Sequence, residues 1–176
     1  MSTTRRQLLG RGLGAAGAAA IPTSLLAATP ALAQQSDETD ALERIVELEL
    51  AAELAYSLAV EDGDLDPDAR DAFERFGGFC GEHATALSKA IDQLDVEPPD
   101  AQSDPADYEA LADFDARAPQ NRQIEFMLAL EDDLVQIYAD ENANLDAPDL
   151  VRSAAEIAAS HAQVRVALED LGAKQG

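Results

Sequence analysis

LELAAELAY (residues 48–56) and LEDDLVQIY (residues 130–138) are the two stretches of this chain that decide its predicted fold. Each contains a Glu followed seven residues later by a Tyr, a spacing that places both side chains on one face of an α-helix. The apolar stripes around these glutamates comprise Leu42, Ile45, Glu49, Glu53, Tyr56 and Val60 in the first case, and Ile124, Met127, Leu128, Glu131, Leu134, Val135 and Tyr138 in the second. The sequence therefore predicts two related helices, each with a carboxylate at the centre of its core face.

Both histidines of the chain lie on apolar stripes of the same kind. The residues of these stripes are spaced alternately by four and by three, which is typical of helices packed in a bundle. One stripe comprises Phe76, Cys80, His83, Leu87, Ala90 and Leu94, and the other comprises Leu150, Ala154, Ile157, His161, Val164, Leu168 and Leu171. A Glu/Tyr helix followed by a His helix thus occurs twice, which indicates a diverged internal repeat.

Turn residues separate the helical segments. Asp66 is a typical N-cap residue, and Pro67 after it suits the first turn of the second helix. Gly172 is a typical C-terminal stop for the fourth helix. The predicted helices span residues 40–60, 67–94, 120–141 and 148–171. The connections between them are short, long and short, so we expect two helical hairpins joined by one crossover. The predicted fold is an all-α antiparallel four-helix bundle over residues 39–172, with a linker at 34–38, a long acidic connection between helices two and three, and a tail at 173–176.

Composition limits the classes of function. The chain has 176 residues, with 35 Asp+Glu against 12 Lys+Arg and a formal net charge of −23. A surface of this charge argues against binding nucleic acid or an anionic membrane, since both require a basic patch. The single cysteine, Cys80, excludes a disulfide within the chain and a zinc cage built from several cysteines.

Residues 1–33 have the layout of an export signal. Three arginines and no acidic residue precede an Ala/Gly/Leu-rich run that ends in the small-x-small sequence Ala31-Leu32-Ala33. The pair Arg5-Arg6 resembles the twin-arginine signal. We expect export by that route and cleavage after Ala33, which places the protein in the periplasm, the cell envelope or the extracellular space. An uncleaved membrane anchor is the alternative, and a homodimer and an envelope partner are left open.

The predicted bundle brings two glutamates and two histidines, one from each helix, toward a common level of the core. A buried carboxylate is costly unless it is protonated, hydrogen-bonded or bound to a cation. Glu49 and Glu131, ionised beside neutral His83 and His161, carry a charge that one divalent ion neutralises. Carboxylate and imidazole ligands suit iron, manganese or zinc. A core network of hydrogen-bonded Glu and His without metal is the alternative.

The sequence resembles the ferritin-like superfamily, and more closely its exported bacterial members. The resemblance rests on Glu49 with Tyr56, His83-Ala84, Glu131 with Tyr138, and His161-Ala162. The resemblance implies a ferritin-like bundle over residues 40–171 and a metal site with Glu49, His83, Glu131 and His161 as ligands. It places Tyr56 and Tyr138 beside those ligands. It also implies that, if the protein is an enzyme, it is an oxidoreductase that depends on iron or manganese.

The chain departs from the di-iron pattern of that superfamily at two positions. The pattern implies a Glu three residues before each His, but Cys80 and Ala158 stand there. Glu53 and Cys80 are the candidates to compensate, Glu53 as an auxiliary ligand and Cys80 close to the ligands or as a thiolate. We therefore expect a degenerate site for one ion. The alternative is a metal-free structural or stress-protective bundle that interacts with envelope partners.

Overall fold

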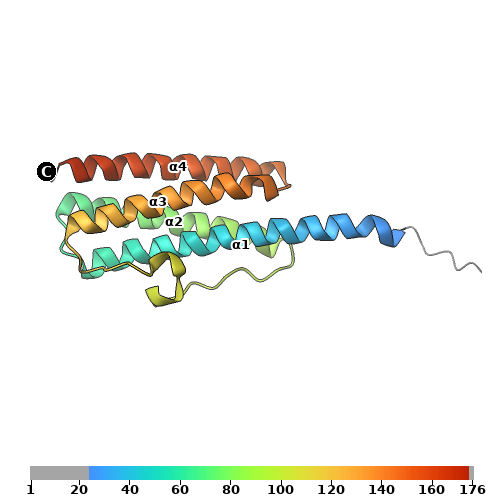
Figure 1. Ribbon diagram of the computed structural model, residues 1–176, viewed down its shortest axis with the longest axis horizontal. Helices are drawn as coiled ribbons and strands as arrows, with labels where there is room; N and C mark the ends of the chain where they lie inside the picture. The colour runs from blue at the N-terminus through green and yellow to red at the C-terminus, as the bar shows by residue number, and fades with distance from the viewer. Residues whose placement is uncertain (1–23, 175–176) are drawn as a thin grey trace, which may run out of the picture.

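The computed structural model describes residues 24–174 and is helical throughout its regular parts, with no strand in that range (Figure 1). Its four long helices are α1 (Ser24–Asp62), α2 (Pro67–Asp92), α3 (Gln120–Glu141) and α4 (Pro148–Ala173). The predicted all-α four-helix bundle is thereby confirmed. The twin-arginine motif and the rest of residues 1–23 lie outside the described residues.

The helices form two hairpins that pack side by side. α1 packs along α2 and α3 along α4, while α1 also contacts α3 and α2 contacts α4. The long connection between α2 and α3 runs back beside α1 and contains the short 3-10 helices η1 (Pro105–Asp107) and η2 (Glu109–Leu111) (Figure 1). A third 3-10 helix, η3 (Asn142–Asn144), lies between α3 and α4. Two hairpins with one crossover are the topology expected from the connection lengths.

Local signals explain where the helices begin. The side chain of Asp66 accepts a hydrogen bond from the backbone N–H of Ala69 at 2.8 Å, and Pro67 occupies the first turn of α2. Gln120, the first residue of α3, exchanges two hydrogen bonds with Asp66. The starts of α2 and α3 are therefore tied together at the same end of the bundle.

The structure differs from the sequence prediction at both ends of the bundle. Residues 34–38, predicted to be a linker, belong to α1, which begins at Ser24. Glu38 is buried, and its carboxylate accepts hydrogen bonds from the backbone N–H groups of Asp146 and Ala147 at 2.9 and 3.2 Å. The polar sequence of 34–38 contains neither Gly nor Pro, so it can continue a helix that the α3–α4 connection covers. At the other end α4 includes Gly172 and Ala173, so the predicted tail begins later.

The core consists of two apolar clusters with charged residues between them. On α1, Glu49 lies between Val46 of one cluster and Ala51 of the other. His161 likewise lies between Ala154 and Val164 on α4. The buried charges are thus enclosed by apolar side chains on both sides. Among the described helices, none combines the length and the apolar character needed to cross a membrane.

Candidate metal centre

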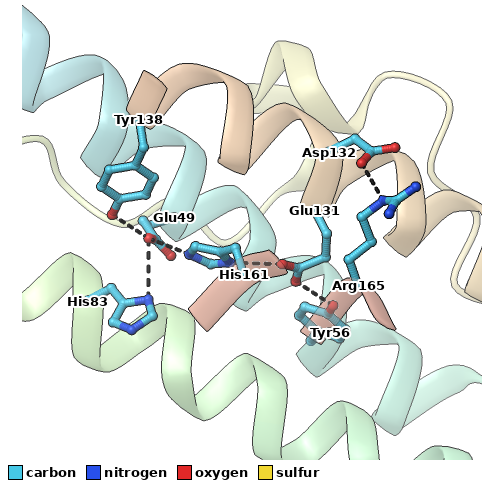
Figure 2. Close-up of polar contacts among 8 residues, drawn as sticks. All are labelled: Glu49, Tyr56, His83, Glu131, Asp132, Tyr138, His161 and Arg165. Carbon is cyan, nitrogen blue, oxygen red and sulfur yellow. Dashed lines mark hydrogen bonds and ion pairs between the residues drawn. The ribbon is translucent and has the colours of Figure 1, made fainter. Parts of the chain in front are cut away.

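Four side chains, one from each long helix, meet in the middle of the bundle. Figure 2 shows Glu49 of α1 and Glu131 of α3 on either side of His161 of α4, with His83 of α2 below Glu49. Both glutamates are fully buried and His161 is buried, whereas His83 is only partly buried. The structure therefore brings together the four residues that the sequence singled out.

His161 lies between the two carboxylates and contacts both of them. Its Nδ1 is 2.8 Å from Glu131 Oε2, and its Nε2 is 2.9 Å from Glu49 Oε1. Burial alone would lower the pKa of His161, but the hydrogen bonds to Glu131 and Glu49 raise this pKa to about 9. With both ring nitrogens donating to carboxylates, the ring is an imidazolium that supplies a positive charge between two buried negative groups.

The two tyrosines bond the carboxylates crosswise between the hairpins. Tyr56 of α1 donates its hydroxyl to Glu131 Oε1 of α3 at 2.7 Å, and Tyr138 of α3 donates to Glu49 Oε1 of α1 at 2.6 Å. Burial and the adjacent carboxylates raise the pKa of both phenols, so both remain donors. A continuous chain of hydrogen bonds thus runs from Tyr138 through Glu49, His161 and Glu131 to Tyr56 (Figure 2).

Glu49 interacts with three side chains of this cluster, Tyr138, His161 and His83. Burial raises the pKa of Glu49, but interactions with His161, His83 and Tyr138 outweigh burial and hold this pKa below its ordinary value. All three interactions involve the same oxygen, Oε1. Glu49 is therefore an ionised carboxylate with one crowded oxygen and one oxygen left over.

Two buried atoms at this point lack a hydrogen-bond partner among the described residues: Glu49 Oε2 and His83 Nδ1. His83 Nδ1 lies 3.4 Å from Glu49 Oε1, which is an ion-pair distance without hydrogen-bond geometry. Buried polar atoms are almost always hydrogen-bonded, so two such atoms without a partner on neighbouring side chains call for an explanation. Both atoms are ligand types for a divalent ion.

Two sets of three donors are close enough to share an ion. Glu49, His83 and His161 form one set, and Cys80, Glu131 and His161 form the other, with the donor atoms of each set within 4.8 Å of one another. His161 belongs to both sets. The donors are carboxylate oxygen, imidazole nitrogen and thiol sulfur, so their chemistry fits a transition metal or zinc.

Glu53, the predicted auxiliary ligand, lies apart from both sets. Its side chain is exposed and rests against Gly81 of α2, where a side chain at residue 81 would meet the Glu53 carboxylate. Partial burial against α2 raises the pKa of Glu53 above its ordinary value. Glu53 follows Glu49 by four residues, which is slightly more than one helical turn. The Glu53 side chain is therefore rotated slightly about the helix axis relative to Glu49, which places it at the edge of the α1–α2 contact.

One ion pair beside the cluster was not predicted from the sequence. Arg165 Nε of α4 lies 2.5 Å from Asp132 Oδ1 of α3, next to Glu131 (Figure 2). Arg165 follows His161 by four residues, and Asp132 follows Glu131 directly. The opposite charges of Arg165 and Asp132, next to two predicted ligands, were the feature of the sequence that could have predicted this ion pair. This surface pair links the two helices that carry Glu131 and His161.

Neither the curated proteins nor the solved structures contain a match to this chain. A sequence profile described as a ferritin-like domain matches residues 37–173. This range contains α2, α3 and α4 in full and α1 from residue 37 onward. The match covers most of the chain and every residue of the Glu/His cluster. Together with the all-α bundle, it shows that the chain belongs to the ferritin-like domain family.

Proposed function

We propose that this protein binds one divalent metal ion, iron, manganese or zinc, in the core of the bundle. Glu49, His83, Glu131 and His161 would hold the ion. The observation that carries the proposal is a pair of buried atoms without a hydrogen-bond partner among the described residues, Glu49 Oε2 and His83 Nδ1, on two side chains that approach each other to 3.4 Å through Glu49 Oε1. A coordinated ion would use both atoms, and without one each carries the cost of an unmade hydrogen bond.

Charge supports the same conclusion. The two buried carboxylates carry two negative charges, and the His161 imidazolium balances only one of them. A divalent ion beside a neutral His161 would balance both of them, which favours ion binding in a core of low dielectric. The ion would supply a compact positive charge, and iron or manganese would also supply redox chemistry. Tyr56 and Tyr138 would hold the two carboxylates in position through their hydroxyls.

The test is the metal content of the purified protein, prepared without chelator and compared with the double variant His83→Ala/His161→Ala. The matched control is Glu82→Ala/Glu156→Ala, which removes exposed carboxylates from the same two helices. We expect about one ion per chain in the wild type and in the control, and none in the histidine variant. A wild type that stays metal-free after reloading under anaerobic conditions would contradict the proposal.

A metal-free structural or stress-protective bundle with envelope partners is the second candidate. The observation that favours it is the chain of hydrogen bonds from Tyr138 to Tyr56, which satisfies most polar atoms of the cluster without an ion. Thermal unfolding with and without chelator separates the two candidates. A metal site predicts a lower Tm in chelator, whereas a metal-free network predicts the same Tm in both conditions.

We also propose export through the twin-arginine route with cleavage after Ala33. The support is the sequence pattern of residues 1–33 alone. The test compares the wild type with Arg5→Lys/Arg6→Lys and with the control Arg11→Lys. We expect the wild type and the control outside the cytoplasm with Gln34 as the first residue. Equal export of the double variant would contradict this route.

A further inference from the structure

We propose that Cys80 is a metal ligand in this centre and binds as a thiolate, so that the site prefers a thiophilic divalent ion such as zinc. This inference rests on the proposed function, because it names a further ligand of the same core site. It narrows the chemical class of the ion, since a site of carboxylate and imidazole ligands alone also suits manganese or iron, whereas a thiolate ligand favours zinc.

The position of Cys80 carries the first part of the argument. Cys80 precedes His83 by three residues on α2, so the two side chains lie on neighbouring parts of one helix face. Cys80 is buried, and its Sγ lies within 4.8 Å of a carboxylate oxygen of Glu131 and a ring nitrogen of His161. The sulfur therefore faces the interior of the cluster, beside two of the four proposed ligands.

A second observation concerns Glu49, the other carboxylate that contacts His161. Glu49 is fully buried, and its Oε2 has no hydrogen-bond partner among the described residues. Burial raises the pKa of the Cys80 thiol, and the charges of Glu49 and Glu131 raise this pKa further. A single weak S–H donor cannot satisfy two carboxylates, whereas a cation bound by Cys80, Glu131 and His161 would place a compact positive charge in the cluster.

The exchange balances in protons and charge. A binding divalent ion displaces the thiol proton of Cys80 and one imidazolium proton of His161 into solvent, and the metal–sulfur and metal–nitrogen bonds form in their place. Two positive charges leave and two enter, so the formal charge of the buried cluster is unchanged. A metal ion deprotonates a coordinating thiol outright, so the raised pKa of the free thiol does not oppose the exchange.

Cobalt(II) is the probe, added to the metal-free full chain in place of zinc. A cobalt–thiolate bond gives an intense charge-transfer band in the near ultraviolet, separate from the visible d–d bands that report cobalt binding of any kind. Cys80 is the single cysteine of the sequence, so a thiolate band has one source. We expect both sets of bands in the wild type, and loss of the near-ultraviolet band with retention of visible bands in Cys80→Ser.

The outcomes are distinguishable. Visible bands without the near-ultraviolet band in the wild type would overturn the role of Cys80 and leave the proposed function standing. No cobalt bands at all would overturn both. Zinc X-ray absorption of the wild type keeps the inference testable should Cys80→Ser fail to fold. It is expected to contain a sulfur neighbour at about 2.3 Å, and a zinc shell of oxygen and nitrogen alone would overturn the inference.

Discussion

His83 and His161 occupy matching places in the two halves of the chain, yet their side chains are 17% and 1% exposed. His161 is held between two carboxylates at 2.8 and 2.9 Å, whereas His83 approaches one carboxylate at 3.4 Å. The two rings lie nearly edge to face with centroids 5.1 Å apart. The pseudo-symmetric sequence thus produces one central histidine and one peripheral histidine, and the two are expected to differ in their effect on stability.

His161→Ala is predicted to destabilise the metal-free protein far more than His83→Ala. Removal of His161 leaves two buried carboxylates without their cation, which costs about 3–5 kcal/mol by analogy with broken buried ion pairs. His83→Ala removes a partly exposed ring and is expected to cost about 1 kcal/mol. Urea unfolding at neutral pH in the presence of chelator measures both values. Equal losses would contradict the central position of His161.

The metal-free protein is predicted to lose stability as the pH rises from 6.5 to 9. The pKa of His161 is raised from 6.5 to about 9 in the folded state, against the penalty of burial, by Glu131 and Glu49. Its stabilising contribution is therefore complete below pH 6.5 and is lost as the pH passes about 9, a change on the order of 3 kcal/mol. The groups that face His161 are Glu49, Glu131, Cys80, His83 and Tyr138.

His161→Gln is the control for this pH dependence, because a neutral amide does not titrate in that range. Urea unfolding of the wild type and of the variant at several pH values provides the comparison. The decline above pH 6.5 should disappear in the variant. At acid pH a second change is expected from Glu49, whose pKa is lowered in the folded state. The stabilising contribution of Glu49 is present above the ordinary pKa of a glutamate and is lost as the pH falls through the lowered pKa of the folded state. A variant with the same alkaline decline as the wild type would assign that decline to other groups.

Tyr56→Phe and Tyr138→Phe are each predicted to destabilise the protein by about 1–3 kcal/mol. Each change removes a buried hydrogen bond to a carboxylate, and bonds of this type are stronger than neutral ones. Tyr108→Phe is the matched control, since the Tyr108 hydroxyl accepts a hydrogen bond from the backbone N–H of the exposed residue Gln102 and makes no hydrogen bond to a carboxylate of the described residues. The urea midpoint of the Tyr108→Phe control should shift less than the midpoints of Tyr56→Phe and Tyr138→Phe. A control shift as large as the other two would contradict the prediction.

Gly77→Ala and Gly78→Ala are predicted to change stability in opposite directions. A Cβ at residue 77 would lie 2.9 Å from the Cβ of Tyr56, so α1 and α2 would have to separate, at a cost of about 1–3 kcal/mol. A Cβ at residue 78 meets nothing within 4 Å, and alanine there gains about 0.5–1 kcal/mol through helix propensity. Thermal unfolding of the two variants decides the matter. Stabilisation by both would show that α1 and α2 tolerate a wider separation at Tyr56.

The sequence by itself determined the number and kind of the helices and the residues at the centre of the core. The recurrence of apolar residues every three or four positions depends only on helix geometry, so it predicted the burial of Glu49, Glu131 and His161 correctly. Caps such as Asp66-Pro67 are equally local, and the start of α2 was predicted for that reason. The helical state of residues 34–38 was not predicted, because the burial of Glu38 depends on a contact with a residue more than a hundred positions away.

Only the tertiary structure decided how these side chains meet. Helix periodicity defines a buried face but neither the rotation nor the axial offset of one helix against another. The crosswise bonds from Tyr56 to Glu131 and from Tyr138 to Glu49 depend on that offset. A rotation of the same kind separates central His161 from partly exposed His83, brings Cys80 to the cluster and leaves Glu53 outside it. A small change in rotation moves a side chain from the core to its edge, and only the packing of all four helices determines its value.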